Sequence, residues 1–130
     1  MPSPSVKLNF FKLNTPDMAR ALAFYRESLG FAVTQTFDEA DFVEHIIQLP
    51  GQHGGPSLLL VWYKDGRDVT PGPGHGPVGL MTDDIEESFA RLIAAGATQV
   101  VPVSEMGPVK FAMLRDPDGH ELELVQLPPS

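Results

Sequence analysis

Apolar residues recur at helical spacing in two segments of the chain, one in each half. In the first segment they are Met18, Leu22, Tyr25 and Leu29. This spacing of three or four residues predicts an amphipathic helix. Thr15 is suited to cap that helix, Pro16 to occupy its first turn, and Gly30 to end it.

The second segment repeats this arrangement. Its apolar positions are Ile85, Phe89, Leu92 and Ile93. Asp83 is suited to cap the helix, with Glu86 three residues further on as in a capping box, and Gly96 is suited to end it. The two helix starts, at Asp17 and Asp84, are 67 residues apart (84 − 17), which indicates an internal duplication.

Short apolar or alternating segments, typical of strands, surround both helices. We expect strands at residues 6–13, 31–36, 42–49 and 57–63 in the first half, and at 78–81, 99–102, 109–115 and 121–126 in the second. Residues 64–76 are rich in Asp, Gly and Pro and predict a linker. The order predicts an α+β chain with two βαβββ modules, about 6–63 and 77–126. A ferredoxin-like α+β domain is the alternative from element order alone.

Composition excludes several classes of protein. The chain has 130 residues, about one domain, and no cysteine, which excludes disulfides, thiolate zinc sites and cysteine nucleophiles. Its formal net charge is −8, and no cluster of basic residues offsets it, so we expect no binding to nucleic acid. No segment has the apolar length of a membrane span, and the start of the chain does not resemble a signal peptide. We therefore expect a cytoplasmic protein without a membrane partner.

Three motifs in order carry a resemblance to a known family. They are Asp17-Met18 followed by residues 23–31 (AFYRESLGF), residues 82–85 (TDDI), and residues 116–124 (DPDGHELEL). Together they resemble the vicinal oxygen chelate superfamily of glyoxalases, bleomycin resistance proteins and dioxygenases, over roughly residues 8–126. The resemblance implies a single domain over residues 1–130, in which the two modules form an open, cupped mixed sheet with helices on the convex side. It also implies a homodimer.

The resemblance assigns metal ligands to positions on four strands, for a divalent zinc, nickel, iron or manganese ion. The first position falls on Phe10, the second within residues 57–61 without a fixed register, the third on Pro77, and the last on Glu123. Of the residues at these positions, only Glu123 has a side chain that commonly binds such a metal ion. We therefore predict no metal as the leading hypothesis. A metal held by Glu123 and His75, two residues before Pro77, is the alternative.

Other pocket candidates follow from strand alternation. Glu123 lies between Leu122 and Leu124 and is expected to face the pocket as a general base, or to be a solvated carboxylate. The candidates for ligand binding are Phe10, Lys12, Leu60, Trp62 and Met113. Lys12 is expected to pair with an anionic ligand or with Glu123, or to be an ordinary edge charge. His45 is interpreted as a buried, hydrogen-bonded histidine, with a proton shuttle as the alternative.

These residues favour a small-molecule-binding protein with a degenerate metal site that sequesters a drug or metabolite. One alternative is an enzyme, either a glyoxalase-like lyase or isomerase that uses Glu123, or an extradiol-type dioxygenase. Another is a regulatory or scaffolding protein without a ligand. The sequence carries no Gly-rich phosphate loop with lysine and no G-x-S-x-G elbow, so it points to no other class of enzyme.

Overall fold

The chain folds into two consecutive βαβββ modules. A computed structural model describes residues 4–52 and 54–129. The first module comprises β1 (Phe10–Asn14), α1 (Met18–Leu29), β2 (Ala32–Asp38), β3 (Phe42–Gln48) and β4 (Ser57–Tyr63). The second comprises β5 (Val78–Met81), α2 (Ile85–Ala94), β6 (Thr98–Met106), β7 (Val109–Arg115) and β8 (Glu121–Gln126). The predicted α+β class with two repeats of strand, helix and three strands is thus confirmed.

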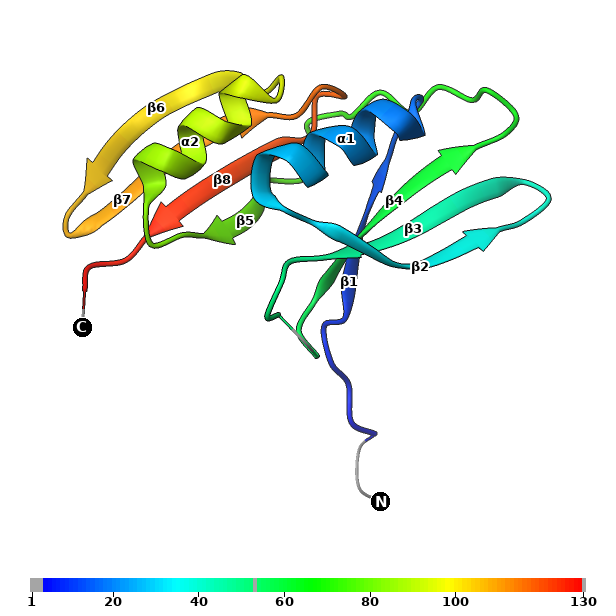
Figure 1. Ribbon diagram of the computed structural model, residues 1–130, viewed down its shortest axis with the longest axis horizontal. Coiled ribbons are helices and arrows are strands. Elements are labelled where there is room, and N and C mark those ends of the chain that lie inside the picture. The colour runs from blue at the N-terminus through cyan, green and yellow to red at the C-terminus, as the bar shows by residue number, and fades with distance from the viewer. Residues whose placement is uncertain (1–3, 53, 130) are drawn as a thin grey trace.

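Each module forms its own four-stranded mixed sheet, and the two sheets lie side by side (Figure 1). The strand order is β1-β4-β3-β2 in the first and β5-β8-β7-β6 in the second. The first and last strands of each module pair in parallel, and the other neighbours pair antiparallel. This ordering leaves β1 and β5 at sheet edges, and each begins close to a cavity described below.

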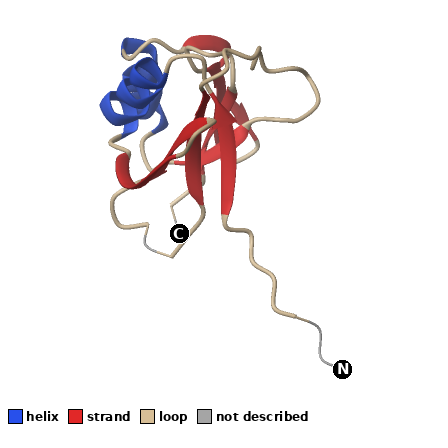
Figure 2. Ribbon diagram, turned by 90° about the vertical axis from the view of Figure 1, so that its right-hand side faces the viewer, coloured by secondary structure: helices blue, strands red, loops and turns tan. Residues whose placement is uncertain are grey.

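Both helices lie on the same side of the strands (Figure 2) and pack against each other. Their buried faces form one hydrophobic core with the inner faces of both sheets. The largest fully buried members include Phe24 and Tyr25 from α1, Leu92 from α2, and Leu114 and Leu124 from the second sheet. Within the described residues, neither helix is long and apolar enough to cross a membrane.

The two helix starts are built in the same way. Asp17 caps α1 by accepting from the Arg20 backbone N–H, and Asp84 caps α2 by accepting from the Glu87 backbone N–H. The predicted caps, Thr15 and Asp83, were therefore wrong by two residues and one residue. The hydroxyl of Thr15 instead accepts from the Asp17 backbone N–H in a turn that precedes the helix. Thr82 and Asp84 repeat that contact, which supports the duplication.

Two strand boundaries differ from the prediction by four residues, and the other differences are of one or two residues. Strand β1 begins at Phe10 and not near Val6, and the side chains of Val6 and Leu8 are 87% and 85% exposed. Strand β6 continues past Pro102 to Met106. Its pairing with β7 shifts register on both sides of Val101, and such irregularities accommodate a proline that has no N–H to donate.

Candidate functional site

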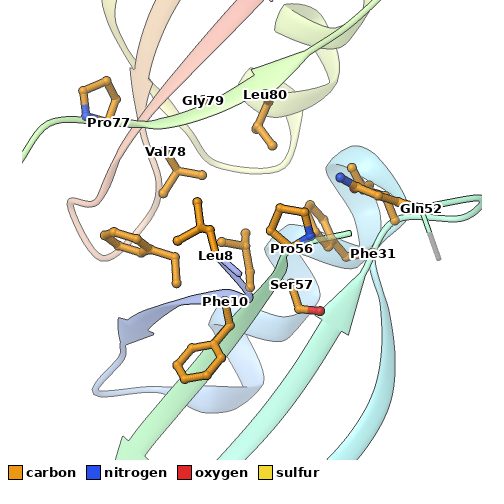
Figure 3. A pocket seen from close by; sticks show the side chains of 13 residues that line it. Leu8, Phe10, Phe31, Gln52, Pro56, Ser57, Pro77, Val78, Gly79 and Leu80 are labelled. Carbon is orange, nitrogen blue, oxygen red and sulfur yellow. The ribbon is translucent and has the colours of Figure 1, made fainter. Parts of the chain in front are cut away.

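A largely apolar cavity of about 280 Å³ lies between the first strand of each module (Figure 3). We call it the seam cavity. Leu8, Phe10 and Pro56 line it from the first module, and Val78 and Leu80 line it from β5. Polar side chains reach it only from Gln52 and Ser57 among the described lining residues. A cavity of this composition favours an apolar guest.

The register of β4 decides which residues of the first sheet face the helices. Leu13, Leu58 and Leu60 are 1%, 7% and 1% exposed and belong to the core cluster. Leu60 is therefore a core residue and is not among the residues that line the seam cavity, so its contact with a ligand stays a prediction. Trp62 shares the face of Leu60 by the two-residue period, so it too lies on the helix side. Leu59, which pairs with Lys12, faces the opposite side.

The face of each sheet opposite the helices, here called the open face, carries the remaining candidates. On the first sheet it presents Phe10 and Lys12 together, with the Lys12 ammonium 5.7 Å from the Phe10 ring centroid. On the second sheet it presents Glu123, whose neighbours Leu122 and Leu124 are buried in the core. Glu123 pairs with Met113 on one side.

The predicted residues therefore form two groups and not one. Phe10 and Lys12 belong to the first sheet, whereas Met113 and Glu123 belong to the second, and among the described residues no strand pairing joins the two sheets. Gly79 is the β5 neighbour of Glu123 and also lines the seam cavity. A Cβ atom placed on Gly79 would meet no atom within 4 Å, so there is open space beside Glu123.

The implied metal positions do not fit a metal ion. The first and third implied positions are occupied by Phe10 and Pro77, which both line the seam cavity. On β4, the residues on the same face as Phe10 include Leu59. None of these three side chains is a metal ligand. Over residues 4–52 and 54–129, no group of three or more His, Cys, Asp or Glu side chains is placed to hold a metal.

His75 lies in the linker between the modules. Its ring packs edge-on against Phe11, with ring centroids 5.8 Å apart. It lines a separate cavity of about 210 Å³ together with Arg115 and Glu121, and Glu123 is not among the residues that line that cavity. The pairing of His75 with Glu123 at a metal stays a prediction.

Lys12 pairs with Glu44, a residue that was not among the predicted site residues. Lys12 Nζ lies 2.9 Å from Glu44 Oε1, and Glu44 is 8% exposed. The alternation of Glu44, Ile46 and Gln48 along β3 was the signal that could have placed this carboxylate on the open face. Its partner could not be predicted, because β1 and β3 are separated by β4 and their distance depends on the sheet order.

His45 lies on the other face of β3 from Glu44. Its Nδ1 is 2.8 Å from the hydroxyl of Thr36 on the neighbouring strand. Partial burial, and then the positive charge of Arg26, lower the pKa of His45 below its ordinary value. The hydrogen bond agrees with the structural interpretation of His45, but the side chain is only partly buried and not buried as predicted.

A polar cluster joins the two modules. The Tyr25 hydroxyl donates to Asp116 Oδ2 at 2.6 Å, and Arg20 forms an ion pair with Asp118. Burial raises the pKa of Asp116 above its ordinary value, and the hydrogen bond from Tyr25 opposes this. Burial, and then the Asp116 carboxylate, raise the pKa of Tyr25 well above its ordinary value.

Comparisons with known proteins agree with this architecture. A protein of Vibrio parahaemolyticus named probable lactoylglutathione lyase is 30% identical over 125 residues, which cover 88% of this chain and 86% of that protein. A solved structure of a glyoxalase I variant from Zea mays superposes with a TM-score of 0.83 at 21% identity, over 92% of this chain and 45% of the maize chain. This chain thus spans less than half of the maize protein.

A third relative binds an antibiotic. The crystal structure of an antibiotic-binding protein from a Streptomyces species has a TM-score of 0.76 and 26% identity, over 99% of this chain and 100% of that one. A family model described as the Glyoxalase/Bleomycin resistance protein/Dioxygenase superfamily matches residues 7–124. With two βαβββ modules in the fold and a family model that matches most of its length, this chain belongs to that superfamily.

Proposed function

We propose that this protein binds a small, largely apolar molecule in the seam cavity. The observation that carries the proposal is the place of Phe10. At the position that the family resemblance assigns to the first metal ligand, Phe10 lines an apolar cavity with Leu8 and Val78. Burying about 200 Å² of an aromatic guest at about 25 cal/mol per Å² gives roughly 5 kcal/mol before the costs of association.

A fluorescence titration with 2-methoxynaphthalene tests this proposal. The matched variants are Gly79→Leu, which adds a side chain at a residue that lines the cavity, and Gly74→Leu in the linker, and at both positions a Cβ meets no atom within 4 Å. We expect the wild type and Gly74→Leu to bind with equal affinity and Gly79→Leu to bind about tenfold more weakly. Equal binding by all three proteins, or binding by none, would contradict the proposal.

We further propose that the bound molecule is sequestered and released unchanged. The similarity to an antibiotic-binding protein over the full length of both chains supports this hypothesis. Mass spectrometry of a ligand recovered after long incubation should return its original mass. A time-dependent change in that mass, lost on heating the protein, would contradict sequestration.

A second candidate function is a lyase that uses Glu123 as a general base. Relatives named lactoylglutathione lyase support it, and Glu123 stands on the open face of the second sheet beside free space at Gly79. The test is the formation and cleavage of lactoylglutathione, with nickel, zinc, manganese or iron added in turn. If the protein takes up metal stoichiometrically and turns over the substrate, and Glu123→Ala abolishes this turnover, the lyase function is supported and sequestration is wrong. If no turnover occurs with any of these metals, the lyase hypothesis is wrong.

We also propose that two copies of the chain form a homodimer. Strands β1 and β5 are at sheet edges, and beside them Leu8 and Met81 are 85% and 70% exposed. Large exposed apolar side chains beside sheet edges favour association with another surface. Light scattering should give twice the chain mass for the wild type and one chain mass for Met81→Glu. A monomeric wild type would contradict this proposal.

A further inference from the structure

Glu44 is a buried carboxylate with unused hydrogen-bonding capacity. Its side chain is 10% exposed, and its Oε1 atom accepts no hydrogen bond within the described part of the chain. Lys12 Nζ lies 2.9 Å from that oxygen, as an ion pair without the alignment of a hydrogen bond, and the Lys12 side chain is 49% exposed. A carboxylate accepts several hydrogen bonds, and buried carboxylates normally have them. Because Oε1 is fully buried beside Lys12, Oε2 is the carboxylate oxygen that a further donor can reach.

The pair faces a second cavity, of about 410 Å³, on the open face of the first sheet. We call it the polar cavity. Glu44 and Lys12 line it together with the amides of Gln35 and Gln48. Phe10 and Ser57 line both this cavity and the seam cavity. One molecule that lies across Phe10 would therefore place an apolar part in the seam cavity and a polar part beside Glu44.

The charges select the kind of polar group. Lys12 already neutralises Glu44, so the polar cavity carries no net charge from this pair. A second cation would approach Lys12 at close range, and an anion would approach Glu44, so both are disfavoured electrostatically. A neutral hydroxyl or amide N–H can donate to Glu44 Oε2 without disturbing the ion pair at Oε1, and a hydrogen bond to a charged acceptor is among the stronger ones.

We propose that Glu44 and Lys12 determine the specificity of this site for a neutral ligand with an apolar body and a hydroxyl or N–H donor. This inference rests on the proposed binding at the seam cavity. It adds a polar subsite on β3 and β1, and it names the chemical class of the ligand. Glu44 acts as the hydrogen-bond acceptor, and Lys12 keeps the subsite neutral.

Four naphthalenes that differ only in the substituent at position 2 test the proposal. They are 2-naphthol, 2-methoxynaphthalene, 2-naphthoate and 2-naphthylmethylammonium. For the wild type we expect 2-naphthol to bind about tenfold more tightly than the methyl ether, because only the hydroxyl can donate to Glu44. The anion and the cation should bind more weakly than 2-naphthol.

Two variants give opposite signatures that a merely structural role would not produce. Glu44→Gln leaves Lys12 without its anion, so affinity for 2-naphthoate should rise about tenfold. Lys12→Met leaves Glu44 without its cation, so affinity for 2-naphthylmethylammonium should rise by a similar factor. The control is Glu87→Gln in the exposed Glu87–Arg91 pair of α2, which should leave all four affinities unchanged.

The outcomes separate this inference from the proposed function. If the wild type binds 2-naphthol and 2-methoxynaphthalene equally, the polar subsite is wrong and the apolar site remains. If it binds none of the four compounds, both proposals fail. If Glu44→Gln does not fold, the Lys12→Met result decides, because half-exposed Lys12 is not part of the core. A Lys12→Met protein that gains no affinity for the cation would overturn the inference.

Discussion

The Tyr25 hydroxyl donates a 2.6 Å hydrogen bond to Asp116 Oδ2, and the two residues belong to different modules. The other oxygen of Asp116 accepts from the backbone N–H groups of Asp118 and His120. His120 Nε2 in turn donates to the carbonyl oxygen of Asn14 at the end of β1, at 2.7 Å. This cluster fixes the β7–β8 turn against the first module, and thereby the relative placement of the strands that border the seam cavity.

Replacement of Tyr25 by Phe removes the donor and leaves the buried Asp116 carboxylate one partner short. We expect the free energy of unfolding to fall by about 1–3 kcal/mol, measured by urea denaturation. The control is Tyr63→Phe at the partly exposed end of β4, which should change it by less than about 0.5 kcal/mol. Equal effects of the two changes would contradict the role of the Tyr25 hydroxyl.

Asp116 should make the stability of the protein depend on pH. Its pKa is raised above 3.8 by burial, so between 3.8 and the native pKa the folded protein holds a proton that the unfolded chain has lost. The free energy of unfolding therefore falls as pH rises through this window. Compared with Asp116→Asn, which has no such titration, the wild type should be most stable below pH 3.8 and should lose that advantage as pH rises. A difference between the two proteins that does not vary with pH would contradict the raised pKa.

The ion pair of Arg20 with Asp118 should matter more than an exposed pair. The Asp118 side chain is 4% exposed, so Arg20→Ala leaves a buried carboxylate without its cation. We expect a loss of about 1–3 kcal/mol of stability. Arg91→Ala removes a partner of exposed Glu87 and should cost less than about 0.5 kcal/mol. Thermal unfolding of both variants checks this difference, and a reversed order would be inconsistent with the cluster.

Substitution of Leu60 should affect the stability of the fold, whereas substitution of Leu8 should affect ligand binding. Leu60 is 1% exposed in the core, so Leu60→Ala should lower the free energy of unfolding by about 2–5 kcal/mol. Leu8 is 85% exposed and lines the seam cavity, so Leu8→Ala should leave stability nearly unchanged and weaken the binding of 2-methoxynaphthalene. Unfolding curves and titrations on both variants provide the test. If Leu60→Ala is as stable as the wild type but binds the ligand more weakly, Leu60 contributes to the binding site and not only to the core.

Much of the fold was predictable from local pattern. Residues 57–63, 78–81, 109–115 and 121–126 form strands with the predicted limits, because glycine, proline and charged residues mark where they stop. The face of β4 was not predictable, because residues 58–61 are all aliphatic and carry no alternation. The pairing of Lys12 with Leu59 resolves it and places Leu60 on the opposite face, toward the helices.

The site was less predictable than the fold. Phe10 and Glu123 could be singled out from short motifs, and the structure places both on open faces. Glu44 and the bond from Tyr25 to Asp116 were missed, because both depend on contacts between elements that are distant in sequence. Alternation along one strand gives the face of a side chain, but only the sheet order and the packing of the modules give its partner.

Methyl NMR provides the most direct measurement of where an apolar ligand binds. Addition of 2-methoxynaphthalene should shift the methyl resonances of Val78 and Leu80, which line the seam cavity. The methyl resonances of Leu114 and Leu124, buried in the core of the second module, should stay in place. Binding without a shift at Val78 and Leu80, or no binding at all, would contradict the account.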